Sequence, residues 1–379
     1  MPAHTLPEPD AAARAASAAL VSCIEQELRR GGNWMSFARY MELVLHAPGL
    51  GYYAGGPAKF GVAGDFVTAP ELGTLFARSL ARQVADLLGP GDAVLEFGAG
   101  TGSLADGLTE ALAACGAHPE YLILETSAAL AARQRARLRA PATWIDRLPQ
   151  GFRGVMIANE VLDAMPSHAL AWTPQGVLER GVCIGEGRLA WAERPATGEV
   201  LAAAQALPVE AGERYESELN LAARAWVRTL AGQLARGAIL IVDYGFPAHE
   251  YYHPQRSGGT LMCHYRHRAH GDPFFLPGLQ DITTHVDFSA LARTAADAEL
   301  EVLGYTNQAQ FLINCGITEL LSEVDASDPR RYAPLAAQAQ MLLSPTEMGE
   351  LFKVIALGRG IDPSLRGFTE GDRAHTLLP

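Results

Sequence analysis

The sequence is poor in positive charge and has almost no lysine. Its 379 residues carry 30 Lys and Arg against 42 Asp and Glu, which gives a formal net charge of −12. Lys59 and Lys353 are the two lysines. A protein whose main task is to bind phosphate backbones needs clustered basic surface. We therefore expect no nucleic acid partner.

Long apolar runs and paired cysteines are also missing. The longest apolar runs, such as residues 238–242, are about a quarter of the roughly 20 residues that a membrane-spanning helix needs. We expect no membrane span. The cysteines at positions 23, 115, 183, 263 and 315 are far apart and form no Cys-x-x-Cys pair, which argues against a zinc site or a disulfide framework.

The first thirty residues contain Glu8, Asp10, Glu25 and Glu27. Signal peptides and acid-poor transit peptides avoid such acids, so we predict no targeting segment. A reducing cytoplasm fits the cysteine usage. The sequence leaves the oligomeric state open, including a homo-oligomer.

From Ala93 onward, short apolar strands alternate with helices, which is typical of a parallel sheet covered by helices on both faces. The pattern predicts an α/β fold with a doubly wound, Rossmann-like sheet. Helices are predicted near residues 20–28, 37–45, 76–88, 104–112 and 218–234, and a hairpin near 177–191. Strands are predicted at 93–97, 121–125, 143–145, 154–158, 238–243, 300–306 and 352–357.

These spacings also predict a domain organisation. N-terminal helices and a glycine-rich loop occupy residues 1–90. The core comprises residues 91–164, 237–247 and 299–360, and an inserted accessory or substrate region comprises 165–236 and 248–298. We expect the substrate apparatus in the insertions.

A glycine-rich turn follows the first predicted strand of the core. Residues 94–104 run through Gly98, Gly100 and Gly102 into a helix. Glycine lets the backbone turn tightly and approach a ligand, and the helix N-terminus adds donors. The dinucleotide fingerprint would require glycine where this chain has Ser103. The spacing instead resembles that of class I S-adenosylmethionine methyltransferases, and a tight turn without a ligand is the alternative.

Two acids follow the next strands. Glu125 ends the strand at 121–125, where a carboxylate can accept both ribose hydroxyl protons of a nucleoside. The alternative is a helix-capping acid ahead of Ser127. Asp146 follows the third strand, where it would contact adenine or remain a solvated loop acid.

Several segments in order resemble one methyltransferase family, the MidA family. They are residues 59–71, 96–104, 159–168, 242–245 and 263–268, and they span roughly residues 33 to 316. The resemblance implies a class I methyltransferase core with an N-terminal helical extension, an accessory domain and S-adenosylmethionine as cofactor. For the mitochondrial members, which include a complex I assembly factor, it implies an arginine of a complex I subunit as substrate.

Arginine chemistry requires acids. A guanidinium is a planar cation and a poor nucleophile, so carboxylates must hold it and localise its charge. Glu160 and Asp163 follow the fourth strand, and a helix beginning after Asn159 would put both acids on one face. The alternatives are that Glu160 caps the helix and Asp163 is solvated. Asn159 is a candidate cofactor contact.

The remaining candidates face the substrate or form a lid. Asp243 and Tyr244 end the fifth strand, with capping as the alternative for Asp243. The loop at 51–71, with Asp65 and Glu71, is predicted to close over the cofactor. His264, His267 and His270 are spaced by three, but nearby arginines disfavour a cation, so we predict no metal site and a lid or docking loop there.

The leading hypothesis is an S-adenosylmethionine-dependent methyltransferase that acts on an arginine of a protein, such as a respiratory-chain subunit. One alternative is methyl transfer to a small molecule or another side chain. The other is a non-catalytic assembly factor that binds a client protein.

Overall fold

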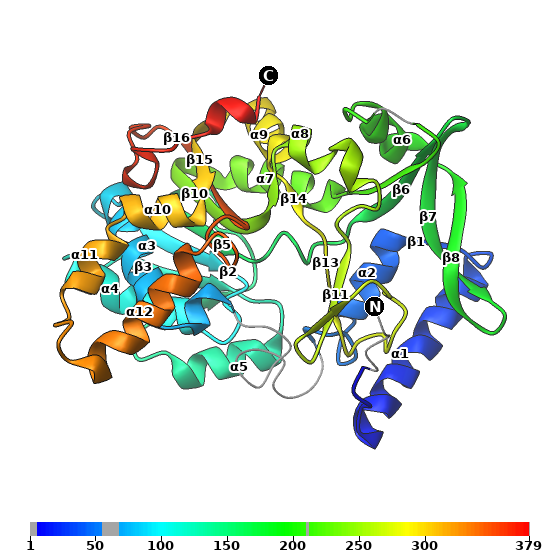
Figure 1. Ribbon diagram of the computed structural model, residues 1–379, viewed down its shortest axis with the longest axis horizontal. Helices are drawn as coiled ribbons and strands as arrows, with labels where there is room; N and C mark the ends of the chain where they lie inside the picture. Colours follow the sequence, from blue (N-terminus) through cyan, green and yellow to red (C-terminus); the bar gives the residue numbers. More distant parts are fainter. Residues whose placement is uncertain (1–5, 55–67, 210–211, 379) are drawn as a thin grey trace. The chain divides into compact units, whose positions relative to one another are not determined.

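The computed structural model describes residues 6–54, 68–209 and 212–378, and its chain divides into two compact units (Figure 1). The accessory unit comprises Met1–Phe66, Asp163–Ala223 and Ala248–Val286. The core unit comprises Val67–Leu162, Arg224–Pro247 and Asp287–Pro379. The predicted three-part division stays a prediction, because these units reflect contacts and not independent folding.

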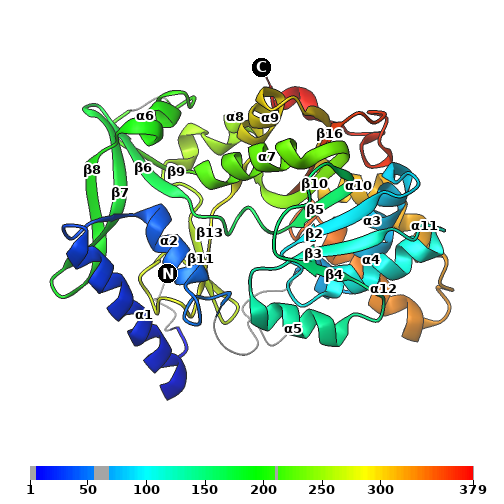
Figure 2. The same ribbon diagram turned by 180° about the vertical axis from the view of Figure 1, so that it is seen from behind.

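The core unit is built on a large, mostly parallel sheet (Figure 2). Its strand order is β15 (Glu301–Asn307), β16 (Phe352–Arg359), β10 (Leu234–Phe246), β5 (Phe152–Asn159), β2 (Ala93–Phe97), β3 (Glu120–Leu124) and β4 (Thr143–Ile145). The strands from β10 to β4 run parallel, and β16 is antiparallel to both β10 and β15. The chain leaves β2 toward β3 and returns to β5 on the other side, which creates a topological switch point.

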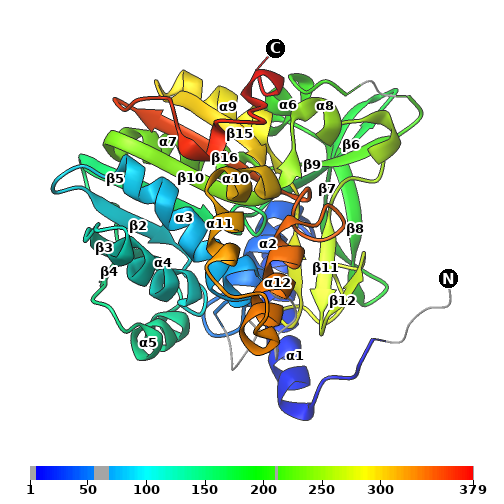
Figure 3. The same cartoon turned by 60° about the vertical axis from the view of Figure 1, so that its left-hand side comes forward.

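Alternation along each strand supplies apolar side chains to both faces of this sheet. On one face, Val94, Val155 and Leu240 share an apolar cluster with helices α3 (Thr74–Leu87) and α4 (Ser103–Ala114), seen beside the sheet in Figure 3. On the other face, the ring of Phe97 lies 4.9 Å from that of Trp226. Trp226 belongs to α7 (Leu221–Gln233). The predicted doubly wound α/β fold is therefore confirmed.

Further helices complete the core unit. They are α5 (Ala128–Arg137), α9 (Phe288–Asp297), α10 (Gln308–Asn314), α11 (Ile317–Ser322) and α12 (Pro329–Leu343), with the short 3₁₀ helices Ala69–Glu71, Arg366–Phe368 and Ala374–Thr376. The two-residue strand β14 (Val286–Asp287) lies at the junction of the units. No helix among the described residues is long and apolar enough to cross a membrane.

The accessory unit combines several helices with two antiparallel sheets. In α1 (Ala11–Arg30) the predicted apolar face of Leu20, Ile24 and Leu28 is fully buried, against α2 (Phe37–His46) among others. The five-stranded sheet contains β1 (Met35–Ser36), β7 (Gly176–Gly185), β6 (His168–Thr173), β9 (Tyr215–Leu219) and β8 (Arg188–Pro195). The smaller sheet contains β12 (Arg268–His270), β11 (Met262–Tyr265) and β13 (Asp281–Thr283). Helix α6 (Gly198–Gln205) lies between β8 and β9, and α8 (Ala248–Tyr251) and a 3₁₀ helix (Pro254–Arg256) precede β11.

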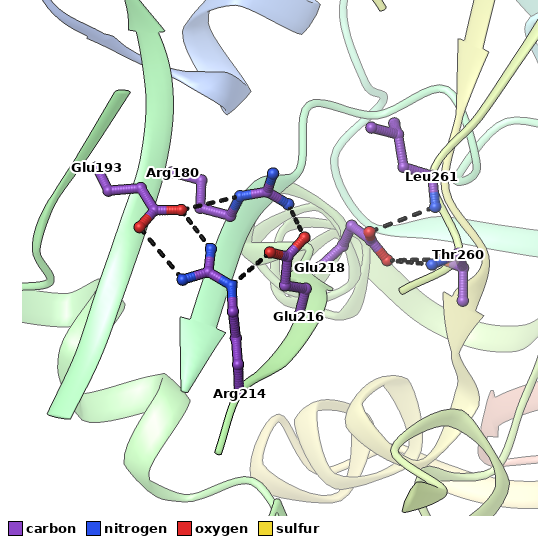
Figure 4. A network of polar contacts seen from close by, with 7 residues as sticks. All are labelled: Arg180, Glu193, Arg214, Glu216, Glu218, Thr260 and Leu261. Atoms are coloured by element: carbon purple, nitrogen blue, oxygen red, sulfur yellow. Dashed lines mark hydrogen bonds and ion pairs between the residues drawn. The ribbon is translucent and has the colours of Figure 1, made fainter. Parts of the chain in front are cut away.

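Charged side chains connect strands of the accessory unit (Figure 4). Arg180 and Arg214 both pair with Glu193 and Glu216, and the Arg214–Glu216 distance is 2.7 Å. Glu218 lies two residues after Glu216 in β9, and its carboxylate accepts hydrogen bonds from the Thr260 amide and hydroxyl, both at 2.8 Å. This network joins β7, β8 and β9 to the segment before β11.

Two local predictions are wrong. No helix begins after Asn159. Glu160 adopts a left-handed backbone with φ +53°, and the residues that follow form bends and turns instead of a helix. The loop predicted around His264 to His270 is a hairpin of β11 and β12, which turns at Arg266 and His267 with positive φ at both residues. The predicted hairpin near 177–191 is confirmed as β7 and β8.

Candidate functional site

The predicted cofactor residues follow the carboxyl ends of neighbouring parallel strands. Register pairs Phe97 with both Leu124 and Ala158. The next residue along each of these strands is Gly98, Glu125 or Asn159, so these three follow one row of the sheet. Asp146 extends the row beyond β4, and Val242 extends it on β10. Ligands of open α/β sheets bind at this edge, beside the switch point between β2 and β5.

The glycine loop has the backbone that close ligand approach requires. Gly98, Gly100 and Gly102 have φ of +56°, +53° and +85°. A Cβ added at Gly100 would meet no atom within 4 Å, so this part of the loop borders open space. A Cβ at Gly102 would lie 2.8 Å from Leu138 Cδ1 and 3.4 Å from the Cα of Gln134, so this glycine packs closely against α5 and the residue that follows it. The loop therefore offers exposed backbone toward a ligand at Gly100.

Glu71 lies against the same loop. Its carboxylate accepts hydrogen bonds from the hydroxyls of Thr101 and Ser103, the latter at 2.6 Å. Arg137 donates to Thr101 at 3.0 Å and lies 3.8 Å from Glu71. A carboxylate at the start of α4 disfavours a phosphate there, because like charges repel. Glu71 therefore argues against a dinucleotide phosphate in contact with Thr101 and Ser103, although Arg137 offsets part of its charge.

Glu125 is partly buried just after β3. Its carboxylate accepts hydrogen bonds from the Ser127 amide at 2.8 Å and from Gln134 Nε2 at 2.9 Å. Burial raises the pKa of Glu125, and these hydrogen bonds oppose that shift. Asp146 differs, because its side chain is 87% exposed and pairs with Arg147 at 3.3 Å. The predicted ribose and adenine roles of the two acids stay predictions.

Asn159 and Glu160 form a constrained turn at the end of β5. The Glu160 amide donates to the Val242 carbonyl at 2.9 Å. The Asp243 carboxylate accepts from the amides of Val161 at 3.3 Å and Leu162 at 2.9 Å. Asp243 is fully buried, and these two hydrogen bonds show that it caps this turn. The left-handed backbone at Glu160 is a costly conformation for a glutamate, and such conformations cluster at functional sites.

The side chains at this turn leave an acceptor for a ligand. Asn159 Nδ2 donates to Glu160 Oε1 at 3.1 Å, whereas its buried Oδ1 has no hydrogen-bond partner among the described residues. Val161 brings the turn to the glycine loop, because a Cβ added at Gly98 would lie 3.5 Å from Val161 Cγ2. Tyr244 lies two residues beyond Val242 on β10, where its ring is 5.3 Å from that of Phe352 in β16, and its predicted substrate role stays a prediction.

Two of the predicted residues, Asp163 and His264, belong to the accessory unit. Asp163 is a buried residue of the accessory unit whose backbone carbonyl accepts from the Thr284 amide at 3.0 Å. His264 lies in β11, in register with Asp281. Asp65 lies outside the described residues. In the described part of the chain, no three His, Cys, Asp or Glu side chains gather as metal ligands would.

The residues at this edge fit S-adenosylmethionine. Gly100 leaves room beside the loop, and Glu125 offers acceptors for hydroxyls. Within the described ranges the Asn159 amide oxygen has no hydrogen-bond partner, and Glu71 engages the hydroxyls of Thr101 and Ser103. Sequence reasoning missed Gln134, which contacts Glu125, because a glutamine in a helix rich in alanine and arginine carries no distinguishing pattern.

Known proteins provide an independent comparison. The S-adenosyl-L-methionine-dependent methyltransferase family Methyltransf_28 matches residues 75–306. A Burkholderia thailandensis protein, in a crystal structure bound to S-adenosyl-homocysteine, is 52% identical with a TM-score of 0.94, covering 98% of this chain and 100% of that chain. A native crystal structure from the same organism is 51% identical with a TM-score of 0.90 and the same coverage.

Curated relatives are more distant. The mitochondrial protein arginine methyltransferase NDUFAF7 of Danio rerio is 30% identical over 366 residues, which cover 85% of this chain and 83% of that protein. Its Homo sapiens counterpart is 26% identical over 371 residues, with 85% and 80% covered. The chain belongs to the Methyltransf_28 family of S-adenosyl-L-methionine-dependent methyltransferases, and its cofactor is S-adenosylmethionine.

Proposed function

We propose that this methyltransferase modifies an arginine side chain of a protein partner, with a respiratory complex I subunit as the first candidate. The names of the NDUFAF7 relatives support an arginine acceptor. So does the family resemblance of residues 159–168. The observation that carries the proposal is the Glu160 turn, which holds a carboxylate beside Asn159 and next to the glycine loop.

Glu160 is suited to hold a cation. Its backbone is fixed on one side by the Val242 carbonyl, and Asp243 bonds the two amides that follow. The carboxylate therefore extends from a rigid turn, which limits the entropy lost when it binds. A guanidinium offers paired N–H donors that match a carboxylate. Asp163 belongs to the accessory unit, and its supporting role stays a prediction.

S-adenosylmethionine supplies an electrophilic methyl group bound to a positively charged sulfur. In the transfer a nitrogen–methyl bond would form as the sulfur–methyl bond breaks, which leaves S-adenosyl-homocysteine, and the guanidinium nitrogen that gains the methyl group must lose a proton. We assign Glu160 to orient that nitrogen first and to accept its proton second. A positioned acid or base of this kind contributes about 10²- to 10⁴-fold to a rate.

The test is transfer of a labelled methyl group into the proteins of a lysate, followed by acid hydrolysis and amino acid analysis. We expect label in methylarginine. Glu160→Gln should bind S-adenosyl-homocysteine within a few-fold of the unmodified protein and transfer methyl groups about 10²-fold more slowly. Asp163→Asn should show a smaller loss.

Glu186→Gln is the matched control, because Glu186 also has a left-handed backbone, with φ +52°, but lies in the exposed turn between β7 and β8. It should leave transfer unchanged. Label recovered in another amino acid or in small molecules would overturn the arginine assignment. Full activity of both Glu160→Gln and Asp163→Asn would move the chemistry to other residues.

A further inference from the structure

Gln134 in α5 is a polar side chain with no exposed surface. Its Nε2 donates to Glu125 Oε2 at 2.9 Å and to the Gly100 carbonyl at 3.0 Å. Its Oε1 accepts from Trp144 Nε1 at 2.8 Å. One buried amide therefore joins the acid after β3, the glycine loop and β4.

The chemistry of these partners fixes the orientation of the amide. An indole nitrogen can only donate, so the oxygen of Gln134 must face Trp144. The two N–H groups then point to two acceptors, a carboxylate and a backbone carbonyl. Because an amide is planar, these two acceptors are held at a set separation. No apolar side chain of similar volume could do this.

Loss of these hydrogen bonds would affect both Glu125 and the glycine loop. Glu125 would lose a donor that offsets its burial, and the Gly100 carbonyl would lose its side-chain partner. An acceptor left buried without a partner costs stability and leaves the group free to move. The glycine loop and the acid would then no longer be held in one arrangement.

We propose that Gln134 is a positioning residue for the cofactor, which sets Glu125 relative to Gly100 and thereby makes binding depend on the ribose hydroxyls. The proposal rests on the cofactor site and is independent of the arginine acceptor. Gln134 itself acts through Glu125 and the loop.

The test compares the dissociation constants of S-adenosyl-homocysteine and of its 2′-deoxy analogue by calorimetry. A hydrogen bond to a charged acceptor implies that the unmodified protein prefers the ribose form by about 10-fold or more. In Gln134→Leu we expect affinity for S-adenosyl-homocysteine to fall about 10-fold and the preference to shrink below about 3-fold. If Gln134 contributed only packing, its substitution would weaken the binding of both ligands equally and leave the preference unchanged.

Gln308→Leu is the matched control, because Gln308 is also fully buried and donates to a backbone carbonyl, that of Leu342, at 3.1 Å. It should leave the preference unchanged. Gln134→Met, which keeps the length without the donors, replaces Gln134→Leu if that variant does not fold and should give the same result.

An unchanged preference in Gln134→Leu or Gln134→Met would overturn the proposal. Glu125→Gln separates this failure from a wrong site assignment. If Glu125→Gln retains the full preference for ribose, then the acid does not contact the hydroxyls, and the proposal falls together with that assignment.

Discussion

Two glutamates, one in each unit, contrast an acid that is predicted to bind the cofactor with an acid that holds strands together. Glu125 follows β3 in the core unit, and Glu218 lies in β9 of the accessory unit. Burial raises the pKa of both, and hydrogen bonds oppose the shift in both. Burial and an altered pKa therefore do not separate them.

Their surroundings do separate them. Glu218 is 5% exposed, and its donors are the Thr260 amide, the Thr260 hydroxyl and the Leu261 amide, so it ties β9 to one segment of chain (Figure 4). Glu125 keeps exposed surface at the carboxyl edge of a parallel sheet, and its partner Gln134 also holds the glycine loop. The predicted ribose role of Glu125 therefore rests on its position at the carboxyl edge of the parallel sheet, and not on burial or pKa.

The largest expected effect concerns the loop beside Glu125. Gly100→Val would place a β-branched side chain in the open space next to the loop and force it into a left-handed backbone. We expect the affinity for S-adenosyl-homocysteine, measured by calorimetry, to fall at least about 10³-fold, or about 4 kcal/mol.

Gly151→Val is the control for backbone strain. Gly151 has φ +63° and open space around its Cβ, but it precedes β5 at the opposite edge of the sheet. Both variants should lose similar stability in thermal unfolding, and Gly151→Val should keep its affinity. A folded Gly100→Val protein that binds normally would remove the glycine loop from the cofactor site.

A third glutamate, Glu96, extends the comparison to the pH dependence of stability. Glu96 in β2 is 2% exposed, and burial raises its pKa to about 7 from the ordinary 4.5, with Glu125 adding to the shift and the Tyr121 hydroxyl at 2.6 Å opposing it. The folded protein therefore retains a proton that the unfolded chain releases. Stability from this group is full below about pH 4.5 and is lost as pH rises toward 7, by about 3 kcal/mol in all.

Glu96→Gln cannot ionise and can still accept from Tyr121. We expect its free energy of unfolding in urea to exceed that of the unmodified protein by about 3 kcal/mol at pH 8, and by less than about 1 kcal/mol at pH 5. A difference that does not change between these pH values would show that Glu96 titrates normally in the folded state.

The sequence predicted the sheet and its edge because those depend on local patterns. Apolar runs marked the strands, and the glycines and Glu125 followed from their place at strand ends. The turn at Glu160 was not predictable in this way, because Asp243, which caps it, lies about eighty residues later. Glu71 reaches Ser103 across 32 residues. Such contacts come from packing of distant segments, which a single sequence does not display.

The prediction for β11 and β12 was wrong for another reason. Its turn uses Arg266 and His267, both with positive φ, where asparagine and glycine are the usual residues. Residue preferences therefore argued for an irregular loop. The pairing of β11 with β13 on its other side stabilises a strand that the turn alone would not favour.

The smallest expected effect concerns Glu218 and completes the comparison with Glu125. Glu218→Gln keeps the side-chain volume but replaces one carboxylate oxygen, an acceptor, by an NH₂ group, a donor. One backbone N–H of Thr260 or Leu261 then loses its acceptor and faces an amide hydrogen. We expect the free energy of unfolding to fall by about 1 to 2 kcal/mol, since a buried donor without a partner costs this much. Affinity for S-adenosyl-homocysteine should stay within about two-fold, whereas Glu125→Gln should lose affinity with a smaller change in stability. If Glu218→Gln instead weakens cofactor binding as much as Glu125→Gln does, then position at the carboxyl edge of the parallel sheet does not identify the cofactor-binding acid, and the distinction between the two glutamates fails.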